Sequence, residues 1–491
     1  MSDILITHSY FLKFDPKEYR AMMPYAPLGT LYAAAVLQRD GYRVTFADSM
    51  LAGSEQHIIP YLETNRPRFF IIYDDDFNYL TKMCLSRMRE AAFVMAGIAR
   101  GYGCTVIVHG SDPVDHAASY FEHGVDFVIH GEGEVTLREL VPLLESGAKE
   151  PFSIPGIMYP SNGEVVSTGP RPVLKDLDAL PLPARELVDM EPYRSAWIRH
   201  QGYFSMNVVT TRGCPFHCNW CAKPLYGQVY HSRSPVAVAE EFARLKKDYQ
   251  PDHIWVCDDI FGLKPGWIAS FASELGRLDA HIPFKCLGRA DLLLRGNTVD
   301  ELKRAGCVNV WLGAESGSQK ILDAMDKGTS VAQIHEATRR LRNAGIQTGF
   351  FIQYGYPGET RDDITSTLKM ITRCRPDQIG ISVSYPLPGT PFYNRVRDQM
   401  KSKTNWEDSE DLAMLYRGTF VPEFYRKLHK VTHSRHRISL GLSQASSLLA
   451  RPAFPDRKSM RAMAAAGYHL PRLLFNSMLL KYYQSKKAGD E

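Results

Sequence analysis

Three cysteines crowd into one short stretch of the chain. The segment TTRGCPFHCNWCAKP (210–224) holds Cys214, Cys218 and Cys221 at the spacing C-x3-C-x2-C, whereas the other six of the nine cysteines are dispersed. Thiolates at such short spacings are typical ligands of iron–sulfur clusters, which usually take four of them. Three thiolates on one loop therefore predict an oxygen-sensitive 4Fe–4S cluster whose fourth iron is open to an exogenous ligand.

Two other interpretations of this triplet stay open. A zinc site would recruit His217 or His231 as the fourth ligand of a Cys3His set. However, His217 lies inside the tight loop, and His231 belongs to no recurring ligand pattern. The third interpretation is chance, and the dispersion of the remaining cysteines argues against it.

The composition limits the class of protein. A chain of 491 residues predicts two domains plus an extension, and 44% hydrophobic with 23% charged residues is typical of globular proteins. A net charge of +4 is too small to indicate a nucleic-acid partner. We expect neither a signal peptide nor a membrane span, because no basic segment precedes an apolar run at the start and no apolar run is long enough. The scattered cysteines then indicate free thiols in a reducing cytoplasm.

The elements that must position the triplet follow from the apolar patterns. In residues 1–145, helical stretches at 28–41 and 82–101 each close on a glycine and alternate with short apolar runs, which we expect to be strands at 4–8, 42–48, 68–74, 104–110 and 125–131. This alternation predicts a doubly wound parallel sheet in a first domain over 1–148. Ligands bind beyond the carboxyl ends of such strands, where the sequence places His8, Asp48, Asp74–Asp76, Gly110, Ser111 and GEGE (131–134).

Residues 149–204 are rich in proline and turn residues and predict a linker with a small hairpin. A second alternating series follows, with strands expected from 207 and at 253–259, 283–291, 308–316, 347–355 and 378–386. Helices are expected near 235–248, 265–279, 298–306, 331–344 and 360–373. Six such units predict an open, partial (β/α)6 barrel over 205–400, followed by a helical extension over 401–491. The cysteines come just after the first strand, where barrels of this kind place their chemistry.

On these residues the chain resembles the radical S-adenosylmethionine superfamily. The resemblance rests on the cysteine spacing, on Trp220 before the last cysteine and on the partial barrel, and it covers about residues 207–400. In that family the open iron binds the amino and carboxylate groups of S-adenosylmethionine, and electron transfer cleaves it to a 5′-deoxyadenosyl radical. The resemblance therefore implies a 4Fe–4S cluster, S-adenosylmethionine and an electron donor such as flavodoxin or ferredoxin.

Further motifs extend the resemblance. VCDDIFG (256–262) is similar to the acidic motif that receives the methionine amino group, which implies that role for Asp258 or Asp259. Their alternative role is a helix N-cap pair. GAESGS (313–318) is similar to the motif whose glutamate contacts the ribose hydroxyls, here Glu315, and the alternative is a salt-bridged glutamate at a strand end.

Three other features are less distinctive. Arg289, at the end of KCLGRAD, is a candidate partner for a carboxylate, and the alternative is an ordinary surface arginine. GYPGET (355–360) and YPLPGTPF (385–392) resemble segments of the cobalamin-dependent branch, and on their own they would pass for turns. No catalytic residue is assigned.

The first domain resembles the cobalamin-binding domain that precedes the radical domain in one class of this superfamily. The segments that carry this resemblance are 26–49, 123–140 and 155–159. HGSD (109–112) is nearest to the family's G-G element, which implies that Gly110 and Ser111 contact the cofactor. The D-x-H-x-x-G motif is absent, so we expect cobalt without a histidine ligand, with His8 as the residue that would be the exception. The alternative is a flavodoxin-like sheet without a coenzyme.

The resemblance implies a cobalamin-dependent radical enzyme that methylates an unactivated carbon of a small-molecule biosynthetic intermediate. One alternative is oxidative ring closure like that of the anaerobic magnesium-protoporphyrin ester cyclases, which the chain also resembles in domain order and in the tail YRGTFVPEFYRKLHK (416–430). The other is an iron–sulfur sensor or electron carrier without catalysis, which would not need the motifs for S-adenosylmethionine.

The end of the chain carries the one indication about the substrate. LPRLLFNSMLLKYYQSKK (470–487) sets apolar residues among Arg472, Lys481, Lys486 and Lys487, and Pro471 is expected to start a helix there. A basic amphipathic helix of this kind favours a large, apolar substrate and peripheral contact with the inner face of a membrane. The alternative is a helix that packs its apolar stripe against the barrel.

Overall fold

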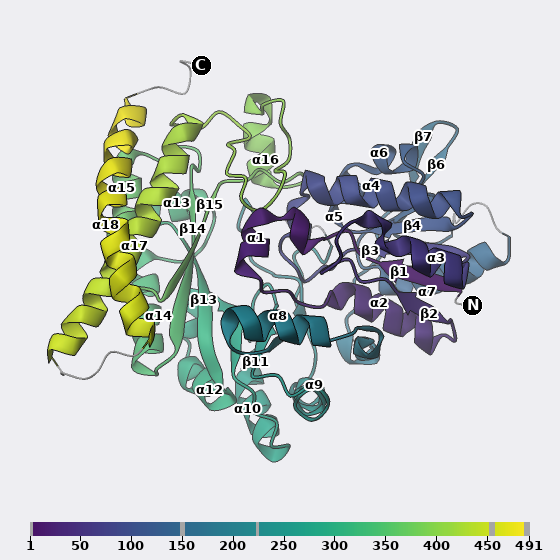
Figure 1. Cartoon of the computed structure of the whole chain (residues 1–491), viewed down its shortest axis with the longest axis horizontal. Helices are drawn as coiled ribbons and strands as arrows, with labels where there is room; N and C mark the ends of the chain where they lie inside the picture. Colours follow the sequence, from purple (N-terminus) through teal and green to yellow (C-terminus); the bar gives the residue numbers. More distant parts are fainter. Residues whose placement is uncertain (1–2, 148–152, 222–224, 451–456, 486–491) are drawn as a thin grey trace. The chain divides into compact units, whose positions relative to one another are not determined.

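The computed structural model describes residues 3–147, 153–221, 225–450 and 457–485 (Figure 1). Their contacts divide the chain into two compact units. The first contains Met1–Pro215, Ala222–Phe284 and Asn405–Asp411, and the second contains Phe216–Cys221, Lys285–Thr404 and Leu412–Glu491. The domain boundaries expected from sequence stay a prediction, since these units interleave along the chain.

The first unit contains the doubly wound sheet. Its strands lie in the order β2-β1-β3-β4-β5-β6-β7, and the first five are parallel. Their bounds are β1 Ile4–Thr7, β2 Val44–Phe46, β3 Phe69–Tyr73, β4 Thr105–His109, β5 Phe127–Ile129, β6 Ile157–Ser161 and β7 Glu164–Ser167. The strand order reverses between β1 and β3, and at such a point a parallel sheet offers a crevice for ligands. The hairpin expected after residue 149 is β6 and β7, which extends this sheet in antiparallel register.

Amphipathic helices cover the sheet because apolar residues recur on one face of each. In α4 the buried residues Met88, Ala91, Ala92, Met95, Ala96 and Ala99 follow a spacing of three and four. Four of these helices are α2 Leu28–Arg39, α3 Ile59–Asn65, α4 Ser86–Gly101 and α7 Glu134–Glu145. The other α-helices described in this part of the chain are α1 Pro16–Ala21, α5 Ser111–Asp115, α6 Ala117–Glu122 and α8 Glu191–Gln201.

The second sheet has six strands in the order β15-β14-β13-β12-β11-β8. They are β8 Ser205–Val208, β11 His253–Val256, β12 Phe284–Gly288, β13 Cys307–Glu315, β14 Gln347–Tyr354 and β15 Gln378–Val383. The strand pairs β8–β11, β13–β14 and β14–β15 are parallel, as an open barrel requires. The predicted fold class, a doubly wound sheet followed by a partial barrel, is confirmed.

Helices separate these strands where their sequences supply caps. The side chain of Ser234 caps α9, and the pairs Ser330–Gln333 and Thr360–Asp363 form capping boxes at α14 and α15. The helices of this series are α9 Pro235–Asp248, α10 Trp267–Arg277, α11 Ala290–Leu293, α12 Thr298–Ala305, α13 Gln319–Ala324, α14 Val331–Asn343, α15 Arg361–Cys374 and α16 Pro391–Val396.

Two long helices, α17 Pro422–Ala450 and α18 Arg457–Gln484, end the described chain and confirm the helical extension. They run side by side in yellow and yellow-green in Figure 1. The expectation that Pro471 starts a helix is wrong, because α18 already begins at Arg457 and Pro471 lies inside it. Both Pro471 and Gly467 lie on the exposed face, where the carbonyl that Pro471 leaves without a backbone donor can meet solvent. Lys486 and Lys487 lie outside the described residues. Within the described ranges, no helix is both long and apolar enough to cross a membrane.

Candidate functional site

A short two-stranded ladder precedes the first cysteine of the triplet. After β8 the chain forms β9 Thr211–Arg212, which pairs in antiparallel register with β10 His231–Ser232. Gly213 follows with a φ of +79°, and a Cβ there would meet the Val229 carbonyl oxygen at 2.3 Å. Only glycine fits this position, so the backbone just before Cys214 is fixed by contact rather than by the cysteine itself.

Asp258 fixes the residues that lead into this ladder. Its buried carboxylate accepts hydrogen bonds from the backbone nitrogens of Thr210 (2.6 Å) and Thr211 (3.1 Å) and from the Thr210 hydroxyl. Burial raises the pKa of Asp258 to about 7, although these hydrogen bonds favour the charged form. Asp259, the neighbouring candidate, pairs with Lys82 at 2.7 Å. The contact of either aspartate with S-adenosylmethionine stays a prediction.

Arg212 joins the same ladder to the first sheet. The guanidinium donates to Glu134 at 2.6 Å and also to Glu132, and all three side chains are buried. The rings of Tyr32, Phe77 and Tyr226 surround it at 5.3–5.7 Å. The GEGE segment (131–134) therefore supplies the counter-charges of a buried arginine, which would otherwise carry a large desolvation cost.

In the second unit, Asn219 holds the segment Phe216–Cys221. Its buried side chain donates to the Ala324 carbonyl (2.8 Å) and to Asp326 (2.7 Å), and it accepts from the Tyr356 hydroxyl (2.7 Å). Its backbone nitrogen donates to Met325 and its carbonyl accepts from the Phe392 nitrogen, at 3.1 and 2.9 Å. Asn219, which directly follows Cys218, therefore has a hydrogen-bond partner for each of its polar groups.

Arg289 lies against this segment. Its guanidinium carbon stacks 3.6 Å from the centre of the Phe216 ring, and its Nη1 lies 3.8 Å from the Cys218 sulfur. The guanidinium also donates to Asp291 and to the Lys327 carbonyl, at 3.0 and 2.8 Å. Arg289 is buried, so the alternative of an ordinary surface arginine is wrong. A cation at this distance can balance the negative charge of a metal-binding cysteine ligand.

A second buried cation, Lys327, lies beside the same cysteine. Its ammonium donates to Glu315 at 2.9 Å and lies 5.7 Å from the Trp220 ring centre. Burial alone would lower the pKa of Lys327, but the charges of Glu315 and Cys218 more than offset this and raise it. Glu315 ends β13 with a φ of +54°, next to an irregularity in the strand register at Gly313/Glu315. The salt bridge weighed as an alternative for Glu315 is therefore present, and its contact with ribose stays a prediction.

Three segments at the carboxyl ends of β13, β14 and β15 are held by specific contacts. At Gly317 a Cβ would meet the Ser366 carbonyl oxygen at 2.5 Å, so GAESGS lies directly on α15. In GYPGET, Glu359 accepts from the Gly355 nitrogen at 2.6 Å, and burial raises its pKa to about 8. In YPLPGTPF, Thr390 caps α16. These segments are turns, and they also fix the carboxyl ends of the strands.

At the carboxyl edge of the first sheet, three consecutive aspartates are buried. Asp74 accepts from the backbone and hydroxyl of Ser9, both at 2.8 Å, and Asp75 accepts from the Gly29 nitrogen at 2.9 Å. A Cβ at Gly110 would approach Asp74 to 3.2 Å, so this glycine allows β4 to end against β3. Ser111 begins α5. The candidate residues Gly110 and Ser111 thus lie at the expected edge, and their contact with a cofactor stays a prediction.

Two histidines lie at this edge. His8 points its Nε2 at Asp48, 3.2 Å away, and Asp48 also accepts from Tyr193. His109, which sequence reasoning passed over, is held through Nε2 by the Gly131 carbonyl at 2.8 Å, and burial lowers its pKa to about 4. Its Nδ1, 3.6 Å from Asp76, has no hydrogen-bond partner within the described part of the chain. Oδ1 of Asp76 and the Tyr73 hydroxyl are also buried, and they too have no hydrogen-bond partner among the described residues.

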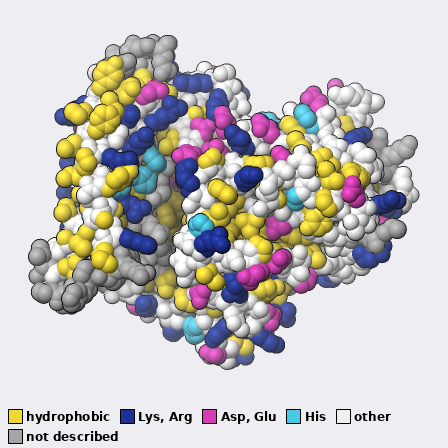
Figure 2. Space-filling model, viewed as in Figure 1, with side chains coloured by type: hydrophobic (Ala, Val, Ile, Leu, Met, Phe, Trp, Pro, Cys, Tyr) yellow, Lys and Arg dark blue, Asp and Glu magenta, His cyan; other side chains and the backbone are white. Residues whose placement is uncertain are grey.

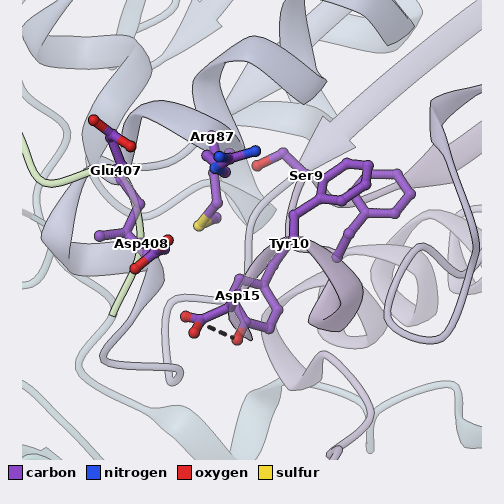
Figure 3. Close-up of a pocket in the computed structure, with 10 residues that line it drawn as sticks. Ser9, Tyr10, Asp15, Arg87, Glu407 and Asp408 are labelled. Atoms are coloured by element: carbon purple, nitrogen blue, oxygen red, sulfur yellow. Dashed lines mark hydrogen bonds between the residues drawn. The ribbon is translucent and has the colours of Figure 1, made fainter. Parts of the chain in front are cut away.

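A small pocket lies elsewhere in the first unit (Figure 3). Ser9, Tyr10 and Asp15 line it from the start of the chain, Arg87 from α4, and Glu407 and Asp408 from the segment 405–411. Asp15 is already bonded to Ser409 through the serine hydroxyl at 2.7 Å and its nitrogen at 3.2 Å. The pocket is therefore the seam where this segment docks, and it contains none of the predicted site residues.

Sequence reasoning found the cysteines and missed the residues that hold them. Lys327 and Asn219 were not singled out, and neither was Arg212. Asn219 stands between two of the cysteines, and that position was the one available signal. The residues described here include no group of three or more His, Cys, Asp or Glu side chains that could hold a single metal ion.

The comparisons with known proteins agree on one family. Residues 208–371 match the model described as the Radical SAM superfamily. The chain is 30% identical over 319 residues to an uncharacterized methyltransferase of Pyrococcus horikoshii, an alignment that covers 62% of this chain and 68% of the relative. It is 25% identical to the hopanoid C-3 methylase of Methylococcus capsulatus, over 86% of this chain and 79% of the methylase.

It is also 27% identical to the anaerobic magnesium-protoporphyrin IX monomethyl ester cyclase of Cereibacter sphaeroides, over 56% of this chain and only 45% of the cyclase. Among solved structures, the cobalamin-dependent S-adenosylmethionine radical enzyme OxsB with aqua-cobalamin bound has a TM-score of 0.72 at 18% identity, covering 98% of this chain and 72% of that one. At this identity the likeness is one of fold. The chain therefore belongs to the radical S-adenosylmethionine superfamily.

Proposed function

We propose that this enzyme cleaves S-adenosylmethionine reductively and transfers a methyl group from cobalamin to an unactivated carbon of a small-molecule substrate. The observation that carries the proposal is the set of charged groups around Cys218. Nη1 of Arg289 lies 3.8 Å from the Cys218 sulfur. The ammonium of Lys327, the second cation, donates a hydrogen bond to Glu315 at 2.9 Å. A cluster with a free coordination position would supply the electron that cleaves S-adenosylmethionine.

The residues of the chain prepare the site for this cofactor. Cations beside Cys218 would offset the negative charge of a reduced cluster. Asn219 keeps the backbone between Cys218 and Cys221 in one conformation, and Gly213 does the same before Cys214. Glu315 is held by Lys327 at the end of β13, where a carboxylate can accept hydrogen bonds from ribose hydroxyls.

The edge of the first sheet fits a polar ligand such as cobalamin. The buried oxygens of Tyr73 and Asp76 and Nδ1 of His109 lack partners among the described residues, and buried polar groups normally have them. Gly110 and Ser111 follow the same β4 strand that ends at His109. We assign these residues to the cobalamin side of the reaction, with the cobalt free of a histidine ligand.

The partners follow from the chemistry. Reductive cleavage needs an external one-electron donor, such as flavodoxin or ferredoxin. The exposed apolar residues of α18 favour a large, apolar substrate and peripheral contact of a cytoplasmic enzyme with a membrane.

Mass analysis of anaerobic turnover tests the proposal directly. Methyl transfer predicts that a candidate substrate gains the mass of one methylene unit and that 5′-deoxyadenosine is formed. Oxidative ring closure, the activity named for the cyclases that the chain resembles, predicts a loss of hydrogen instead. Absence of S-adenosylmethionine cleavage by the reduced protein would leave only the sensor or electron carrier.

The cluster gives the first prediction. Anaerobically reconstituted protein should bind about four irons per chain, and changing Cys214, Cys218 and Cys221 to Ala should remove them. Iron analysis and the visible absorption of the cluster provide the measurement. A single zinc in the wild type, or iron that survives in the triple variant, would contradict the assignment.

Asn219→Ala tests whether the hydrogen bonds that hold the segment Phe216–Cys221 are needed for iron binding. It removes the side-chain bonds to Asp326, Tyr356 and the Ala324 carbonyl, although the last two stay bonded to each other at 2.9 Å. We expect a cost of about 1–3 kcal/mol for a buried group that is left unsatisfied. We expect a lower melting temperature and slower reconstitution of iron. Asn309→Ala is the matched control, because Asn309 is also buried but lies near the start of β13, at the opposite end of the strand from Glu315.

A double-variant cycle separates the two roles of Glu315. Glu315→Gln leaves Lys327 buried without a counter-charge, which should cost about 3–5 kcal/mol of folding stability. Lys327→Met combined with Glu315→Gln removes both charges and should restore much of the melting temperature. If Glu315 contacts ribose, the affinity for S-adenosylmethionine stays roughly tenfold or more below wild type even in the double variant. Recovery of both quantities would reduce Glu315 to a structural ion pair.

Electron paramagnetic resonance tests the cobalt environment. With cobalamin bound and reduced to Co(II), we expect no strong axial nitrogen splitting from the protein. His8→Ala and His109→Ala should leave the spectrum unchanged, because His8 is paired with Asp48 and His109 is stacked on Tyr73. A splitting that disappears in one of these variants would identify that histidine as the lower ligand.

A further inference from the structure

The C-terminal helix α18 has its large apolar residues on the outside. Helices of soluble proteins normally turn their apolar stripe toward the core and their charged residues toward water. α18 departs from this pattern, since seven large apolar or aromatic side chains are between 48% and 64% exposed: Met460, Tyr468, Leu470, Leu474, Phe475, Met478 and Tyr482. Its other large apolar or aromatic residues are half-buried: Met463, Leu473, Leu479, Leu480 and Tyr483. Figure 2 shows such yellow side chains along the C-terminal hairpin, with dark blue basic groups beside them.

The inner face of α18 explains why the large residues lie outside. There α18 approaches α17 closely, because a Cβ at Gly441 would meet Ala466 Cβ at 2.5 Å and the Ala462 carbonyl oxygen at 2.6 Å. Ser434 and His469 connect the two helices at 3.2 Å. Small residues fill this contact, so the packing of α18 on α17 leaves the larger apolar residues without a neighbouring layer.

The exposed residues form one stripe. Met460, Ala464, Tyr468, Pro471, Phe475, Met478 and Tyr482 are all exposed and follow one another at intervals of three or four residues, which places them on one face of a helix. By the same geometry Arg461 and Arg472 fall on one edge of this stripe and Lys481 on the opposite edge, and all three are exposed. Leu474, also exposed, lies one turn before Met478 and beside the stripe. We call the stripe, Leu474 and these three cations the α18 face.

The charges of the hairpin indicate which partner the α18 face would accept. The sequence of α18 contains five Lys or Arg and no Asp or Glu, and that of α17 contains five Lys or Arg and one acid, Glu423. A second copy of the chain placed on this face would set cation against cation without carboxylates to pair them. An anionic lipid surface neutralises the same cations and takes up the apolar stripe.

We propose that the α18 face docks on anionic phospholipid membranes, with the apolar stripe at the boundary between head groups and acyl chains and with Arg461, Arg472 and Lys481 among the lipid phosphates. This inference gives the residues and the lipid chemistry of the peripheral contact included in the proposed function, and it rests on that proposal. Pro471 suits such a position, because a carbonyl freed on the outer face can accept hydrogen bonds from interfacial water.

Vesicle flotation of the reconstituted full-length protein tests the proposal. We expect binding to vesicles of phosphatidylcholine with phosphatidylglycerol, weaker binding to phosphatidylcholine alone, and a decrease at high salt. Leu474→Ser with Met478→Ser should lower binding roughly tenfold or more. Arg461→Gln, Arg472→Gln and Lys481→Gln together should lower it roughly tenfold to a hundredfold at low salt and much less at high salt.

Matched control variants change exposed residues of the same kinds outside α18. Ile198→Ser with Val236→Ser removes two exposed aliphatic side chains, and Lys175→Gln, Arg199→Gln and Lys247→Gln together remove three exposed cations. Both should bind like wild type. Circular dichroism and melting curves check that every variant folds.

Several outcomes would overturn the proposal. Wild-type protein that does not float, or control variants that lose binding as strongly, would remove the α18 face as the site. A dimer in sedimentation that Leu474→Ser with Met478→Ser makes monomeric would show an interface between two copies instead. S-adenosylmethionine cleavage without vesicles is measured in parallel. Flotation without cleavage would contradict the proposed function but support the membrane site. Cleavage without flotation would support the proposed function but contradict the membrane site.

Discussion

The hydrogen bonds of Asn219 are the constraint on which the cluster segment of the second unit depends. A loop with two cysteines three residues apart has no regular structure of its own, so its conformation must come from neighbours. Asn219 supplies it, because its side chain bonds to Ala324, Asp326 and Tyr356 and its backbone bonds to Met325 and Phe392. Since the side chain is buried, each of these bonds would be costly to lose.

The first unit holds Cys214 by a different means. There the chain is fixed by a carboxylate, Asp258, that accepts from Thr210 and Thr211, and by the arginine that follows them. Arg212 is neutralised by Glu132 and Glu134 from the edge of the first sheet. Within this unit, the strand that leads to a cluster ligand therefore shares buried charges with the edge assigned to cobalamin. A change at the GEGE segment is expected to reach the cysteine loop through Arg212.

Charge serves different purposes in different parts of the molecule. Around Cys218 two buried cations, Arg289 and Lys327, are each paired with a carboxylate. In the C-terminal hairpin most of the cations whose side chains are described are exposed, and the two helices contain one acid, Glu423, which leaves these cations available to an anionic surface. Burial decides between the two uses, because a buried cation requires a counter-charge nearby and an exposed one does not.

The sequence alone determined the strand and helix order and the three cysteines. These features depend on local patterns: apolar periodicity predicts elements, and short thiol spacing predicts a cluster. Boundaries shifted by a few residues, and the start of α18 was misplaced because proline suggested a helix end where the helix continues. The pattern of apolar and basic residues also indicated an amphipathic helix near the C-terminus. It did not determine which face of that helix would be exposed to solvent.

Only the tertiary structure decided what each candidate side chain contacts. Asp258 bonds to a residue 48 positions away, Asn219 to one 105 positions away, and Lys327 crosses 12 positions to Glu315. Such partners depend on strand register and on how loops meet at the ends of strands, which one sequence does not specify. The outward face of α18 was decided in the same way, because the close contact at Gly441 selects small residues for the inside and leaves the large apolar ones exposed.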